Sequence, residues 1–124
     1  MALIVTNLDI EQGADYAHEW QWLVADDEGQ QVPRDLTGYV GRLDVRRHAA
    51  DTTTLTTAHS LTDTPGNITL SADGVVRVEW AAAVSSGWLW RTGVYDLELV
   101  DPDGGVTRFA SGLVHVSAEV TRSA

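Results

Sequence analysis

Apolar and polar residues alternate with a period of two along most of the chain. In the stretch 93–100, Tyr95 and Leu97 fall on one face and Asp96 and Glu98 on the other. This is the pattern of a half-buried strand, because successive side chains of a strand point to opposite sides of its sheet. The same alternation recurs at 3–11, 16–24, 39–47, 68–72, 76–80, 106–110 and 113–120. It predicts an all-β domain of about seven to nine strands.

Turn residues separate these runs at the short intervals typical of a β-sandwich. Asp73-Gly74 predicts a tight hairpin, and residues 81–87 have the composition of one short helical turn. No helical segment is long enough to return the chain between parallel strands. We therefore expect an antiparallel, immunoglobulin-like β-sandwich that forms a single domain over residues 1–124.

Single residues add finer expectations about this sandwich. Trp20 and Trp22 share one face of their run, which favours a central strand, whereas the Thr-rich run 52–58 favours an edge strand open to a neighbour's strand. Gly112 is expected to interrupt the last run. Tyr95 stands where sandwiches often carry a tyrosine whose hydroxyl binds backbone just upstream, although it could equally be an ordinary core residue.

The charge balance narrows the classes of partner. The chain has 18 Asp and Glu against 8 Lys and Arg and a net charge of −10, which would repel nucleic-acid phosphates and anionic membrane surfaces. No apolar run approaches the roughly 18 residues of a membrane helix, and residues 1–13 lack the basic region and cleavage pattern of a secretory signal. We expect neither nucleic acid nor membrane as a partner and no export by that route. The chain has no cysteine, so disulfides are excluded.

The sequence offers little chemistry for catalysis or metal binding. Asp101 and Asp103 precede Gly104 and could begin a cation loop, but the twelfth position counted from Asp101 is Gly112, which cannot supply the closing carboxylate. A hairpin tip is the better interpretation. No Gly-x-Ser-x-Gly elbow or phosphate-binding glycine motif occurs. The histidines stand singly, at His18, His48, His59 and His115.

We therefore expect no catalytic residue, cofactor or metal, and not an enzyme. Two of the acidic residues could still converge in the fold as a glycosidase pair, but the sequence singles out none.

Candidate interface residues come from three places. Trp20, Trp22 and Trp80 alternate with polar residues and are expected in the core, whereas Trp88 and Trp90 follow the helical turn and could contact a partner or stack on a sugar.

A basic cluster is either a solvated face or a dock for the acidic surface of a neighbouring subunit; it consists of Arg42, Arg46, Arg47 and His48. The acidic tips Asp101 and Asp103 could meet that basic face on the next copy in a ring.

Four stretches occur in an order that resembles a family of small virion proteins of tailed bacteriophages. They are LDIEQGADYAHEWQW at 8–22, DLTGYVGRLDVRR at 35–47, GNITL at 66–70 and GVYDLELVDPDGGVTRFASGLVHVSAEVTR at 93–122. The family is similar in pattern to the N-terminal, immunoglobulin-like domain of phage baseplate upper proteins. The resemblance implies a structural role in the tail, neck or baseplate, with other virion proteins as partners and several copies around a symmetric ring.

Taken together, we expect a non-enzymatic, multi-copy tail or neck adaptor that is assembled in the bacterial host cytoplasm and resides in the virion. The chain ends at EVTRSA without an appended fibre module, which favours an adaptor or decorating subunit over a host-recognition protein. The alternatives are a capsid decoration (cement) protein and a carbohydrate-binding module that uses Trp88 and Trp90.

Overall fold

The computed structural model describes residues 3–61 and 65–121. These residues are mostly β, with 53% in strands and one short helix, which confirms the all-β prediction. The helix α1 (Ala82–Ser85) lies where a helical turn was predicted. The strands are β1 (Ile4–Val5), β2 (Leu8–Glu11), β3 (Tyr16–Gln21), β4 (Leu23–Ala25), β5 (Gln31–Pro33), β6 (Val40–Arg46), β7 (Thr56–His59), β8 (Gly66–Leu70), β9 (Val75–Trp80), β10 (Thr92–Val100) and β11 (Val106–Ser117).

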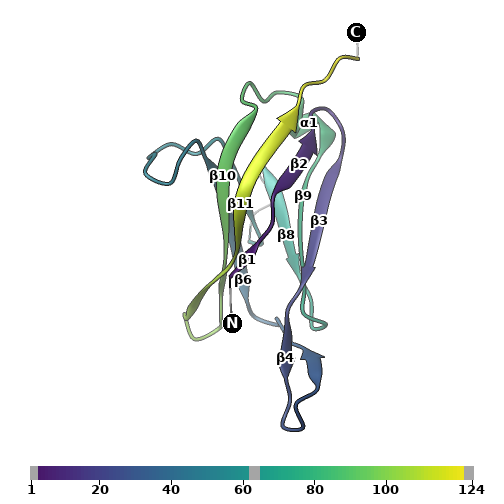
Figure 1. Cartoon of the computed structure of the whole chain (residues 1–124), viewed down its shortest axis with the longest axis vertical. Helices are drawn as coiled ribbons and strands as arrows, with labels where there is room; N and C mark the ends of the chain where they lie inside the picture. Colours follow the sequence, from purple (N-terminus) through teal and green to yellow (C-terminus); the bar gives the residue numbers. More distant parts are fainter. Residues whose placement is uncertain (1–2, 62–64, 122–124) are drawn as a thin grey trace.

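Nine of these strands form one strongly curled, mixed sheet shaped like a half-barrel (Figure 1). Its order is β1-β11-β10-β6-β7-β8-β9-β3, and β2 also pairs with β11. The expectation of a purely antiparallel arrangement is wrong, because β1, β2 and β8 each make a parallel pair, with β11, β11 and β7 respectively. Parallel strands are usually connected by a crossover helix. For β1 and β2 with β11 the intervening strands β3–β10 make this connection instead.

The strand predicted over 16–24 is divided at Trp22, and β4 pairs with β5 in a separate hairpin that projects from the body (Figure 1). The backbone of Trp22 leaves the main sheet: its N–H donates to the Gly74 carbonyl at 2.8 Å and its carbonyl accepts from Arg34 N–H at 2.9 Å. Strand β3 is the last in the sheet order, so the prediction of a central strand is wrong. Trp20 is nevertheless buried, because the sheet curls over it.

The Thr-rich segment also differs from its prediction. Its strand β7 pairs with β6 on one side and with β8 on the other, and both Thr56 and Ala58 are buried. It is therefore an interior strand of the sheet order, paired on both sides at Ala58 and His59, and the prediction of an edge strand is wrong.

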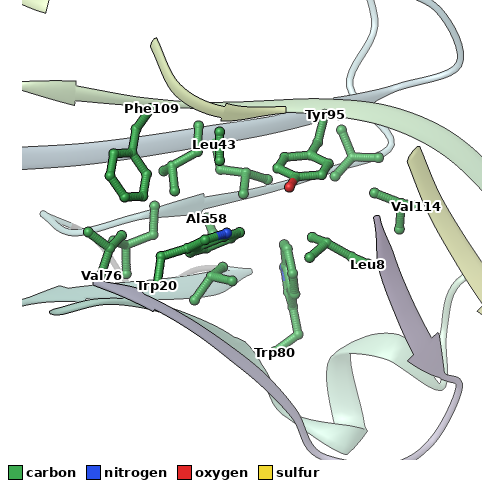
Figure 2. Packing of buried hydrophobic residues seen from close by; sticks show 14 of the residues in the cluster. Leu8, Trp20, Leu43, Ala58, Val76, Trp80, Tyr95, Phe109 and Val114 are labelled. Carbon is green, nitrogen blue, oxygen red and sulfur yellow. The ribbon is translucent and has the colours of Figure 1, made fainter. Parts of the chain in front are cut away.

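The inward faces of the curled sheet meet in one core (Figure 2). Trp20, Trp22 and Trp80 belong to it, as predicted. Phe109 lies between two of these indoles, with ring centroids 6.2 Å from Trp20 and 5.7 Å from Trp22. At the end of the chain the predicted alternation fails, because Ala118 and Val120 are exposed. Arg122, which closes the family-like motif, lies outside the described residues.

Strand β11 runs unbroken through Gly112, so the predicted interruption there is wrong. The glycine instead allows close approach by the link between β1 and β2: a Cβ atom at position 112 would come within 2.2 Å of the Thr6 carbonyl oxygen. The Tyr95 hydroxyl donates to the same oxygen at 2.6 Å. The expected bond to backbone just upstream of Tyr95 is thus replaced by one to the N-terminal segment.

Within the described part of the chain, α1 is the sole helix, and it is far too short to cross a membrane.

Candidate protein-interaction site

The outward side of β6, β10 and β11 carries alternating charges that form ion pairs, two of them between neighbouring strands and one along β6. The Arg42 Nε donates to Glu98 Oε1 at 2.8 Å, Arg46 Nη2 lies 3.0 Å from Asp44 Oδ2, and Arg108 Nε lies 3.7 Å from Asp96 Oδ2. We call these residues the charge ladder: Arg42, Asp44, Arg46, Asp96, Glu98 and Arg108.

The period of two creates this ladder. In β6 the buried Leu43 and Val45 alternate with the outward arginines and Asp44. In β10 the buried residues alternate in the same way with Asp96 and Glu98. Pairing of the two strands then sets Glu98 opposite Arg42 but Asp96 opposite Asp44. Like charges opposed across strands are unfavourable, so Asp96 and Asp44 depend on the arginines beside them.

An open groove of about 720 Å³ lies alongside the ladder, lined in part by Asp44, Arg46, Asp96 and Arg108. Large apolar side chains stand at its rim. Val5 is 74% exposed and Leu113 is 58% exposed. Exposed apolar side chains bordered by charged ones are typical of a protein contact surface.

The pKa of Asp96 is raised above the ordinary aspartate value. Burial is the largest cause, and the neighbouring carboxylates Glu98 and Asp44 add to it, whereas Arg108 and Arg46 act in the opposite direction. The arginines therefore compensate only partly for the crowding of negative charge around Asp96.

We expect the stability of the Asp96→Asn variant relative to the original chain to increase with pH. A raised folded-state pKa means that the folded protein holds the Asp96 proton more tightly than the unfolded chain does, so stability is lost as pH rises from 3.8 through the raised value. Asparagine does not titrate, so the variant escapes this loss. Urea unfolding of both proteins at several pH values between about 3 and 7 measures the difference.

Asp35→Asn is the control, because its stability relative to the original chain should decrease as pH rises. Hydrogen bonds from Thr37 lower the pKa of Asp35, so its carboxylate contributes stability above 3.8 that is lost as pH falls. A gap between Asp96→Asn and the original chain that does not grow with pH would contradict the prediction.

The ladder is electrically neutral, unlike the rest of the chain. It holds three of the arginines and three of the acidic residues. The remaining residues therefore carry the whole net charge of −10.

The structure distributes the predicted interface residues over different places. Arg42 and Arg46 lie on the ladder and are paired within the chain, whereas Arg47 follows β6 and is exposed. Asp101 and Asp103 lie in the turn between β10 and β11.

The turn between β10 and β11 is a hairpin tip, as predicted. Asp101 Oδ1 accepts the backbone N–H of Asp103 at 2.9 Å and of Gly105 at 2.8 Å, so this carboxylate closes the turn. Among the described residues no three histidine, aspartate or glutamate side chains gather as a metal-binding group.

The tryptophans after α1 offer little surface. Trp88 is 8% exposed and belongs to the core, and Trp90 packs partly buried against it, with the two ring centroids 4.8 Å apart. The exposed side chain of this segment is Leu89. The stacking platform that a sugar would need is therefore mostly covered.

Sequence reasoning missed Arg108, Val5 and Leu113 as parts of this face. The alternation that places Val114 inward also turns Leu113 outward, so this residue could have been found. Arg108 and Val5 could not, because their positions depend on the pairing of β11 with β10 and β1.

Comparison of the chain with protein-family models found no match, and comparison with curated proteins found none either.

Proposed function

We propose that the chain is a non-enzymatic structural protein of a tailed-phage virion, a multi-copy tail or neck adaptor that binds other virion proteins. The observation that carries the protein-binding part is the neutral charge ladder beside the exposed Val5 and Leu113. A face of this kind suits reversible protein contact, because its charges are already paired and its apolar side chains gain from burial. The virion assignment rests on the four family-like stretches.

The immunoglobulin-like interpretation of the fold is part of this proposal. The curled sheet divides into two groups, β11-β10-β6-β7 and β8-β9-β3. Among the described residues, two strand-paired positions join them, Ala58 with Gly66 and His59 with Asn67. In this proposal the two groups are the facing layers of the sandwich, and the short β7–β8 pairing connects them.

Mass spectrometry of purified virions from the phage that encodes the chain tests the assignment. We expect peptides of this chain in the particle, in the tail or neck fraction after capsids and tails are separated. Consistent absence from intact virions would refute the proposal. Peptides confined to the capsid fraction would instead support the decoration alternative.

A further inference from the structure

A second copy of the chain is the partner that the charge pattern fits best. Two molecules that each carry −10 repel one another in most orientations. The charge ladder is a face on which opposite charges balance, so two copies that meet there avoid most of that repulsion. Val5 and Leu113 on its rim supply apolar area to bury.

The groove on the other half of the sheet fits a second copy less well. It measures about 680 Å³ and is lined by Asp15, Arg77 and Glu79, among others. Arg77 forms ion pairs with two carboxylates: Nη1 lies 3.1 Å from Glu19 Oε2 and Nη2 lies 3.7 Å from Glu79 Oε2. Negative charge is therefore in excess there. Among the residues that the structure describes, none of the large exposed apolar ones lines this groove.

The arginine and aspartate at the β10–β11 pair are the least satisfied members of the ladder. The separation of 3.7 Å between Arg108 Nε and Asp96 Oδ2 is the longest of the three ion pairs, and the Arg108 side chain is 62% exposed. Asp96 faces Asp44 across the strands. Its carboxylate would gain from a further cation, and Arg108 is exposed enough to serve a carboxylate outside its own chain.

We propose that the charge-ladder face is the contact of a symmetric homodimer in which Arg108 of each copy reaches Asp96 of the other copy. A two-fold contact requires one patch to hold both complementary groups, and this face does. The inference rests on the proposed role as a protein-binding module and names a second copy as one of its partners.

Sedimentation velocity of the whole chain, over a range of concentrations at low and high salt, measures the association. We expect a concentration-dependent shift from monomer to dimer. Leu113→Glu should weaken the dimer at least tenfold, because it places a charge in the apolar rim. Leu89→Glu is the matched control, since Leu89 is 95% exposed and follows α1, outside the ladder, and it should leave the dimer unchanged.

A charge exchange tests the specific contact. Arg108→Asp alone and Asp96→Arg alone should each weaken self-association, whereas an equimolar mixture of the two variants should form a heterodimer at least tenfold tighter than either homodimer. Thermal melts of each variant show that it is folded. A monomeric chain at all concentrations, equal effects of the two leucine variants, or no gain on mixing would overturn the inference.

The two proposals fail separately. A chain that is monomeric in solution but present in virions would remove the dimer and leave the virion role standing. A chain that dimerises through this face but is absent from virions would do the reverse.

Discussion

Replacing Trp80 by alanine is expected to cost about 3–5 kcal/mol of unfolding free energy, a large part of the stability of a domain of this size. The indole is 1% exposed, and its ring centroid lies 6.3 Å from that of Tyr16 and 6.0 Å from that of Trp88. Its Nε1–H donates to the Thr57 carbonyl at 3.1 Å. Removal leaves a cavity and takes this hydrogen bond away from the half-buried Thr57 carbonyl.

The position of Trp80 makes the loss larger than its size alone would. A Cβ atom at Gly66 would come within 2.4 Å of the indole Nε1, so the ring lies directly against the first residue of β8. Gly66 belongs to the junction where β7 and β8 connect the two halves of the curled sheet, and Thr57 directly precedes it in β7. Trp80 therefore supports the β7–β8 junction as well as the core.

Chemical and thermal denaturation, followed by circular dichroism, measure the effect of Trp80→Ala. A loss of this size lowers Tm by about 10 °C or more. Trp80→Phe retains most of the buried ring but loses the hydrogen bond, so its stability should lie between that of the original chain and that of Trp80→Ala. Leu89→Ala, at a side chain 95% exposed, should change stability by less than about 0.5 kcal/mol. Equal stability of Trp80→Ala and Leu89→Ala would contradict this description of the core.

Local alternation predicted which side chains are buried but not which strands are neighbours. Leu43, Val45, Tyr95 and Leu97 are all buried as their runs indicated, because the face of a strand on which a residue lies depends only on its position in that strand. The place of a strand in the sheet depends on distant partners. Two tryptophans indicate burial, and the curled sheet buries Trp20 in its last strand, β3.

The candidate site was predictable to the same extent. Arg42 and Arg46 could be placed on one outward face from the sequence of β6 alone. Their relation to Asp96 and Glu98 requires the register between β6 and β10, and the bulge in β11, between the partners of Leu97 and Glu98, sets where Arg108 falls. No local pattern contains that information, which is why the sequence indicated a basic cluster where the structure has a neutral ladder.

Gly112 illustrates how one residue can have a local and a long-range interpretation. Glycine often interrupts strands, but here it admits the link between β1 and β2. Thr6 N–H donates to the Ser111 carbonyl at 2.9 Å, and Leu113 N–H donates to Asn7 Oδ1 at 3.0 Å. On its other side the Thr6 carbonyl accepts the Tyr95 hydroxyl. The Thr6 carbonyl is thus held between Tyr95 and the Cα of Gly112.

We expect Gly112→Ala to displace this link and cost about 1–3 kcal/mol or more, as overpacking against rigid groups does. The added methyl would lie 2.2 Å from the Thr6 oxygen and 2.8 Å from its carbonyl carbon, and neither atom belongs to a flexible side chain that could turn away. The amides of Thr6 and Leu113 should then exchange with solvent much faster, while amides in β8 and β9 change less because they lie on the other half of the sheet.

Two further variants separate the clash from other effects of Gly112→Ala. Gly87→Ala is the matched control, because its new Cβ would meet only the Val84 carbonyl oxygen at 3.7 Å, an ordinary contact. Tyr95→Phe removes the hydrogen bond to Thr6 without adding bulk, so it should free the same amides to a smaller degree. Hydrogen exchange followed by NMR resolves these residues. Unchanged protection of the Thr6 and Leu113 amides in Gly112→Ala would contradict the prediction. It would mean that the backbone can shift to admit the methyl group while the link between β1 and β2 stays bound to β11.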